Sequence, residues 1–141
     1  MDFDLARLDP LHLGQVNGEH TVGHLGFDFG VVHAFSQLKY PIEITNAVFM
    51  GMGEPFHNYD NTMSAIDTLN DPDGYNFGAR RFTISTVGLV PQIRRFADEK
   101  RQVNLAISLH AADDNERLAI MPVNKRYKID DVIQACRYYV E

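Results

Sequence analysis

The segment Asn46-Ala-Val-Phe-Met-Gly-Met-Gly-Glu-Pro55 decides how this chain is expected to fold. Its apolar run, Ala47 to Met50, is typical of a short strand that is buried on both faces. The run ends in two glycines, Gly51 and Gly53, which let a backbone approach a ligand closely. Glu54 then places a carboxylate just beyond the strand. Because parallel α/β folds bind ligands at the carboxyl ends of their strands, this segment predicts a pocket.

The composition sets limits on the class of protein. The chain has 141 residues, of which 45% are hydrophobic, as in one globular domain with a core. Its net charge of −6 counts against a chain that grips nucleic acid through bulk electrostatics. A single cysteine, Cys136, excludes an internal disulfide and a multi-cysteine metal cage within this chain. No apolar run reaches the length of a membrane span and no secretory signal is visible, so we expect a cytoplasmic protein.

Apolar spacing and turn residues predict strands that alternate with helices. We expect strands at 44–50, 82–86 and 103–109, and helices at 30–39, from 58 or 60 to 69, from 91 past 96, at 113–120 and from 130 onward. This order predicts an α/β fold with a parallel three-stranded sheet and right-handed crossovers. Three strands are too few to close a barrel, so residues 30–141 are interpreted as part of a (β/α) TIM-like barrel. Residues 1–29 have no steady apolar period and are interpreted as an irregular segment.

The expected caps of the helices are Asn58 or Asp60, Asp113 and Asp130, and Pro91 is expected in a first helical turn. The expected inward residues of the helices are Met63, Ile66 and Leu69, then Ile93 and Phe96, then Val132, Ile133, Cys136, Tyr139 and Val140.

Small polar residues lie at the ends of all three predicted strands. Glu54 is suited to accept hydrogen bonds from an ammonium group, and Ser85 and Ser108 are suited to hold a carboxylate or a ribose hydroxyl. His110 is suited to stack on a ring or to donate a hydrogen bond. Together the set favours a nucleoside that contains an amino acid. It does not form a nucleophilic triad, because no acid is evidently placed to orient His110 against a serine.

Four segments resemble the radical S-adenosylmethionine adenine-C2 methyltransferases that act on 23S rRNA and tRNA. They are Phe49–Pro55, Arg80–Pro91, Leu105–Ala111 and Met121–Lys125, and their order and spacing match that family. The resemblance begins near Gly30 and continues to the end of the chain. It implies a partial radical S-adenosylmethionine (SAM) barrel with a 4Fe–4S cluster and S-adenosyl-L-methionine at its mouth. It also implies that the full-length enzyme acts on rRNA and tRNA.

The resemblance also implies cofactor-binding residues by their positions. These are Gly53, Glu54, Ser85, Ser108, Leu109 and His110. Gly53 and Glu54 correspond to the family's contact with the methionine amino group, Ser85 to a further contact, and 108–110 to the segment that lines the cofactor. No catalytic residue and no metal ligand is assigned to this chain.

The chain departs from the family at the cluster. The family's Cys-x3-Cys-x2-Cys motif should lie shortly before Gly30, and no cysteine is there. Cys136 lies on an expected amphipathic helix, where it is interpreted as a buried core residue. One cysteine cannot supply the several thiolates of an iron–sulfur cluster. We therefore expect this chain alone to bind no cluster and to be inactive.

The family's later strands, a further cofactor contact and its methyl-accepting cysteine have no counterpart in this sequence. The abrupt start of the resemblance near Gly30 leads to the hypothesis of a frameshift or a gene-boundary error. Sequencing the surrounding genomic DNA would test this hypothesis, because it requires an upstream frame that encodes three cysteines.

Two other functions are considered. A metal hydrolase is indicated by His20-x3-His24, which has the spacing of a zinc-binding helix, with His12 and His33 nearby. The glycines in this region and the absence of a glutamate directly after His20 favour ordinary loop histidines instead. A non-catalytic nucleotide-binding or scaffold α/β domain is favoured by the missing cysteines. A truncated barrel would also expose apolar strand edges and helix faces, so we expect self-association of this chain.

Overall fold

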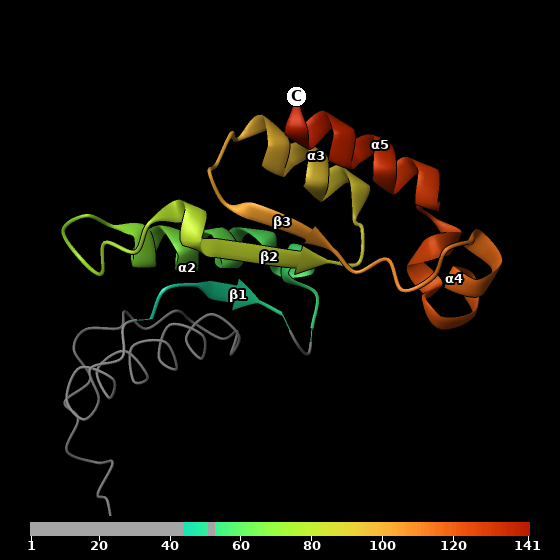
Figure 1. Cartoon of the computed structure of the whole chain (residues 1–141), viewed down its shortest axis with the longest axis horizontal. Helices are drawn as coiled ribbons and strands as arrows, with labels where there is room; N and C mark the ends of the chain where they lie inside the picture. Colours follow the sequence, from blue (N-terminus) through green and yellow to red (C-terminus); the bar gives the residue numbers. More distant parts are fainter. Residues whose placement is uncertain (1–43, 51–52) are drawn as a thin grey trace, which may run out of the picture. The chain divides into compact units, whose positions relative to one another are not determined.

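The computed structural model describes residues 44–50 and 53–141 (Figure 1). The elements are β1 (Ala47–Phe49), the 3-10 helix η2 (Pro55–Asn58), α2 (Tyr59–Asn70), η3 (Ala79–Arg81), β2 (Phe82–Thr86), α3 (Val90–Asp98), β3 (Asn104–Ile107), α4 (Asp114–Ile120), η4 (Pro122–Lys125) and α5 (Ile129–Val140). The predicted helix at 30–39, the irregular segment 1–29 and the boundary between them lie outside the described residues.

The strands form a parallel sheet in the order β1-β2-β3. Phe49 is aligned with Ile84, and Ile84 with Leu105, so the three strands run side by side in one direction. This arrangement confirms the predicted α/β fold with a parallel three-stranded sheet. The second strand has the predicted bounds, whereas β1 and β3 are each shorter than the predicted 44–50 and 103–109.

The core lies on one face of the sheet. Along β2, Phe82, Ile84 and Thr86 are buried, while Thr83 and Ser85 between them are partly exposed. The predicted inward residues of α2 (Met63, Ile66 and Leu69) and of α3 (Ile93 and Phe96) are all buried. Side chains alternate between the two faces of a strand, so the face that carries Ser85 is the face away from this core.

Within residues 44–50 and 53–141, the first strand is buried on one face only. Phe49 is buried and its ring centroid lies 6.3 Å from that of Phe82. The neighbouring Val48 and Met50 are 55% and 59% exposed. The prediction of a strand buried on both faces is therefore wrong, because an apolar run alone does not show whether a second layer covers it.

The buried face of the last helix matches the predicted one only in part. In α5, Val132 and Ala135 are buried, whereas Ile133 and Val140 are 40% and 77% exposed. The α5 helix lies beside α3 (Figure 1), and Phe96 of α3 stacks on Tyr139 with centroids 5.5 Å apart. Ala135 is fully buried although its side chain is small, so counting the large apolar residues along the helix does not reveal this face.

Helix starts follow the predicted chemistry at α3 and α4, whereas Asn58 takes the predicted N-cap position of α2 without a side-chain capping hydrogen bond. Pro91 lies in the first turn of α3, and Asp113 caps α4 by accepting hydrogen bonds from the N–H groups of Asn115 and Glu116. The predicted cap at Asp130 is wrong. The capping residue of α5 is Lys128, whose N–H donates to the carboxylate of Asp131.

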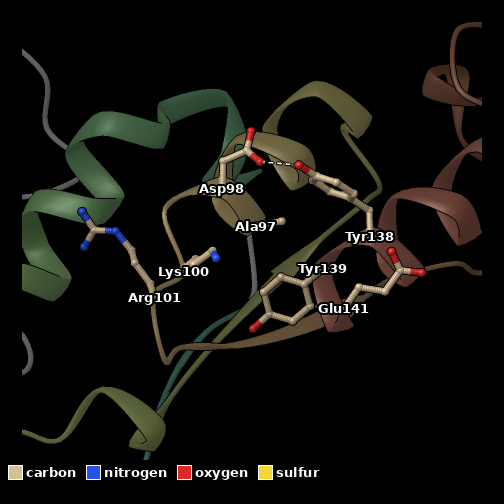
Figure 2. A pocket seen from close by; sticks show the side chains of 7 residues that line it. All are labelled: Ala97, Asp98, Lys100, Arg101, Tyr138, Tyr139 and Glu141. Carbon is tan, nitrogen blue, oxygen red and sulfur yellow. Dashed lines mark hydrogen bonds between the residues drawn. The ribbon is translucent and has the colours of Figure 1, made fainter.

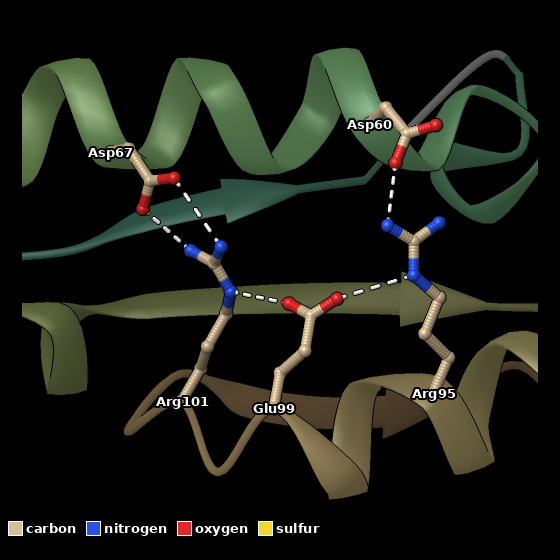
Figure 3. Close-up of polar contacts among 5 residues, drawn as sticks. All are labelled: Asp60, Asp67, Arg95, Glu99 and Arg101. Carbon is tan, nitrogen blue, oxygen red and sulfur yellow. Dashed lines mark hydrogen bonds and ion pairs between the residues drawn. The ribbon is translucent and has the colours of Figure 1, made fainter.

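A chain of alternating charges joins α2 to the end of α3 (Figure 3). Arg95 bridges Asp60 and Glu99, with N···O distances of 2.6 and 3.2 Å. Arg101 bridges the same Glu99 at 2.7 Å and reaches Asp67 of α2. These side chains are 27% to 80% exposed, so their contribution to stability is modest and screened by salt.

Gly88, just after β2, has the least room for a Cβ atom among the glycines that the structure describes. Its φ is +98°, and a Cβ there would lie 2.8 Å from Cγ2 of Val132. Only glycine tolerates both the conformation and the contact.

We predict that Gly88→Ala lowers the free energy of unfolding by about 2–4 kcal/mol through backbone strain and overpacking. Gly78→Ala is the matched control, because Gly78 has a φ of −58° and nothing within 4 Å of its Cβ position. The control should change stability by less than about 0.5 kcal/mol. Urea denaturation measures both, and equal effects would contradict the assignment.

Candidate ligand site at the strand ends

Glu54 ties the end of β1 to the end of β2. Its Oε2 accepts a hydrogen bond from the N–H of Val87 at 2.8 Å, across 33 residues of sequence. Its Oε1 accepts from the N–H of Phe56 at 3.0 Å and so caps η2. The predicted meeting of these two strand ends is therefore confirmed. The carboxylate also has a structural role, because it satisfies one backbone donor just after β2 and one in the first turn of η2.

Gly53 supplies the turn that delivers Glu54. Its φ is +99°, and no atom lies within 4 Å of the position that a Cβ would take. Glycine is thus needed for the backbone conformation rather than for lack of space. The space beside this peptide is open.

Ser85 and Ser108 join the ends of β2 and β3. Their Oγ atoms lie 2.8 Å apart, and the N–H of Ser108 donates to the carbonyl of Thr86 at 2.9 Å. Both serines lie on the face of the sheet opposite the core, because each continues the alternation of its strand. The structure thus brings together two of the predicted site residues as one pair of hydroxyls.

His110 and Leu109 complete the predicted set. His110 is exposed and has a φ of +65°, a left-handed conformation that is uncommon for a side-chain-bearing residue. Such conformations cost on the order of 1–3 kcal/mol and persist where the surrounding contacts enforce them. The enforcing contact lies at the preceding residue, because the carbonyl of Leu109 accepts a hydrogen bond from Nε of Arg117.

Sequence reasoning missed Arg117, which is completely buried. Its guanidinium donates to four oxygens: the carbonyls of Val87, Leu109 and Tyr127, and Oδ1 of Asn124. Burial lowers the pKa of this guanidinium, and the charge of Asp114 opposes that shift. An arginine on a short helix is ordinarily exposed, so the residue type gave no signal. Asn124 lies in one of the four matched segments, but no role was attached to it.

Asn124 extends the same contacts away from the strand ends. It is fully buried, and its Nδ2 donates to the backbone carbonyl and to Oδ1 of Asp114, both at 2.9 Å. The N–H of Ile129 donates to the same Oδ1 at 3.1 Å. These hydrogen bonds to the ionised form lower the pKa of Asp114. The start of α5 is thereby fastened to α4.

A separate hollow lies at the other end of the sheet (Figure 2). It has a volume of about 540 Å³ and is lined by Ala97, Asp98, Lys100, Arg101, Tyr138, Tyr139 and Glu141. Tyr138 donates to Asp98, and Tyr139 donates to the carbonyl of Val103, which directly precedes β3. The hollow therefore lies where β3 begins, and in βα folds that end contributes to stability rather than to chemistry.

Cys136 is half-buried rather than a core residue. Its partial burial raises the pKa of the thiol. Within residues 44–50 and 53–141, no three His, Cys, Asp or Glu side chains are grouped closely enough to hold a metal ion. In the same part of the chain, no helix combines the length and apolar character of a membrane span. His12, His20, His24 and His33, the basis of the metal-hydrolase alternative, lie outside it.

Known proteins show similarity over most of this chain. The sequence profile of the Radical SAM superfamily matches residues 31–141. A probable dual-specificity RNA methyltransferase RlmN from Thermoanaerobacter sp. (strain X514) is 54% identical over 99 residues, which cover 70% of this chain and 29% of that protein. The corresponding protein of Heliobacterium modesticaldum is 58% identical over 99 residues, covering 70% of this chain and 26% of the relative.

A solved structure is similar as well. The crystal structure of a radical SAM methyltransferase from Sphaerobacter thermophilus superposes with a TM-score of 0.81 at 46% sequence identity. The alignment covers 86% of this chain and 35% of that one. The chain thus spans less than a third of the length of the two curated relatives described above. With its parallel sheet and the profile match across residues 31–141, the chain belongs to the Radical SAM superfamily.

Proposed function

We propose that this chain is the S-adenosylmethionine-binding part of an RNA methyltransferase that methylates adenine C2 in 23S rRNA and tRNA. The observation that carries the proposal is the joining of three strand ends by Glu54 with Val87 and by Ser85 with Ser108. The relatives that are named RNA methyltransferases support the substrate class. RNA modification of this kind favours a cytoplasmic location.

The proposed ligand contacts use hydrogen-bond acceptors and donors of Glu54, Ser85 and Ser108 that remain after their contacts within the chain are counted. Each carboxylate oxygen of Glu54 accepts one backbone bond and keeps a further lone pair for the ammonium group of the ligand. In the pair Ser85–Ser108, one hydroxyl donates to the other, so one hydrogen remains free for a carboxylate or a ribose oxygen. The open space beside Gly53 admits the ligand backbone.

Leu109 and His110 form the remaining wall of the proposed site. The left-handed turn at His110 directs the chain away from β3 directly after Ser108 and Leu109. The exposed imidazole is available to stack on a flat ring. Neither residue is assigned a proton-transfer role, because the proposed task of this site is to bind and orient.

The residues present do not fit an iron–sulfur cluster, which the superfamily uses together with S-adenosylmethionine. Cluster binding needs several thiolates. The only cysteine of the chain, Cys136, lies in α5, which packs on α3. We therefore derive no chemical step through the cluster, and the proposal for this chain is limited to binding.

We predict weak, saturable binding of S-adenosylhomocysteine in isothermal titration calorimetry. Glu54→Gln should weaken it about tenfold, because the variant loses a charge-assisted hydrogen bond to the ammonium group. Asp73→Asn is the control, since Asp73 is an exposed carboxylate in the turn after α2. No binding by the unmodified chain would favour the scaffold alternative, and an unchanged affinity of Glu54→Gln would remove Glu54 from the site.

We predict that anaerobic reconstitution with iron and sulfide leaves the chain without a stoichiometric cluster. The measurement is iron content per chain together with visible absorbance. Cys136→Ser is the control and should give the same trace. A stoichiometric, cysteine-dependent cluster would show that the chain, or an assembly of copies, supplies the missing ligands.

We also propose that copies of this chain associate. Among the described residues, β3 is paired on one side only, by β2, and Ile120 and Val140 are 61% and 77% exposed. Unpaired strand edges and exposed apolar side chains favour association between chains.

Light scattering over a concentration series should show a mass that rises with concentration. Val140→Lys, which places a charge on an exposed apolar position, should shift the rise to higher concentration. A constant monomer mass at high concentration would contradict the proposal.

A further inference from the structure

We propose that Arg117 is a positioning residue: it holds the loops after β2 and β3 in the geometry that binds the nucleoside, without touching the nucleoside itself. This inference rests on the proposed function of the strand-end site. The inference gives α4 a role in binding. The four segments that resemble the methyltransferase family do not indicate this role, because Arg117 lies between Leu105–Ala111 and Met121–Lys125.

The first support is where the guanidinium donates. One bond goes to the carbonyl of Val87, the residue whose N–H is held by Glu54. Another goes at 3.2 Å to the carbonyl of Leu109, which stands between Ser108 and His110. A single side chain thus fastens the residue after β2 that binds Glu54 and the loop after β3 that carries Ser108, Leu109 and His110. These two carbonyls belong to residues 30 and 8 positions away in sequence.

The second support is the geometry required of the donor. The planar guanidinium has five N–H groups in fixed directions, and its bonds here leave from all three nitrogens. Val87, Leu109 and Asn124 lie on different segments, so their oxygens must take fixed relative positions to be reached together. An ammonium group has three donors on one flexible stem and does not impose such positions.

The third support is the fit of the surrounding atoms. A Cβ on Gly88 would lie 3.4 Å from Nη2 of Arg117 and 2.8 Å from Val132 of α5. The loop after β2 therefore rests directly on the guanidinium. The side chain of Arg117 is 0% exposed, so it is unavailable to a ligand in solution and acts through the backbone that it holds.

Energetics also favour a positional role. A buried cation loses much of its hydration, and burial lowers the pKa of Arg117. Its four hydrogen-bond acceptors are uncharged oxygens, three carbonyls and the amide of Asn124. Since buried charges are weak sources of net stability, fixing the shape of the strand ends accounts better for this arginine than stabilisation alone.

The test compares ligand affinity with stability. We expect Arg117→Lys to weaken binding of S-adenosylhomocysteine about tenfold in calorimetry under conditions where urea denaturation shows the variant to be folded. Ile66→Val is the stability control, because it trims a fully buried residue of α2 away from the strand ends. It should lower stability and leave affinity within twofold. Arg95→Lys, at an exposed arginine, should change neither property appreciably.

Two further variants cover a failure of Arg117→Lys to fold. Asn124→Ser removes one acceptor of the guanidinium and should weaken binding about threefold. Arg117→Ala should regain affinity with added guanidinium ion at tens of millimolar, and not with sodium chloride at the same ionic strength. This rescue separates positioning from a general loss of stability, because guanidinium ion lowers stability in general.

Each outcome has a definite meaning. Equal affinity of Arg117→Lys and the unmodified chain would overturn the positioning role and leave the proposed function intact. An equal loss in Ile66→Val would also overturn it, by showing that affinity follows stability. Absence of binding by the unmodified chain would overturn the proposed function, and the positioning role with it.

Discussion

Backbone groups at the carboxyl ends of parallel strands must find hydrogen-bond partners once the sheet stops, and this requirement shapes the molecule. At the end of β2 the requirement is met by side chains from distant segments. Glu54 accepts from the N–H of Val87, and Arg117 donates to its carbonyl. The end of β3 is held in the same way through the carbonyl of Leu109. The candidate site is the surface left between these attachments.

Core and site occupy different faces of the same strands. Phe82, Ile84 and Thr86 of β2 are buried in the core with α2 and α3. Ser85, which lies between Ile84 and Thr86, faces away from this core and pairs with Ser108. Packing therefore fixes the strand, and strand alternation fixes where the hydroxyl points. The charged chain from Asp60 to Arg101 joins the two helices on the outside and leaves the strand ends free.

Much of this arrangement could be predicted from local sequence. Strand β2, the inward residues of α2 and the cap at Asp113 depend on neighbours within a few residues, and all three agree with the structure. The wrong predictions concern how elements pack against one another. Whether β1 is covered on its second face depends on layers that its own residues do not encode. The buried face of α5 depends on how closely α3 approaches, and Ala135 was overlooked because its side chain is small.

By itself, the sequence determined a parallel α/β fold with polar residues at the end of each strand, because apolar period and turn chemistry are local properties. Only the tertiary structure decided which of those residues meet. The hydroxyls of Ser85 and Ser108 pair across 23 residues, and Arg117 reaches Val87 across 30. The periodicity of the sequence does not predict such contacts. They depend on strand register and on the burial of the Arg117 guanidinium, and arginine is ordinarily exposed to water.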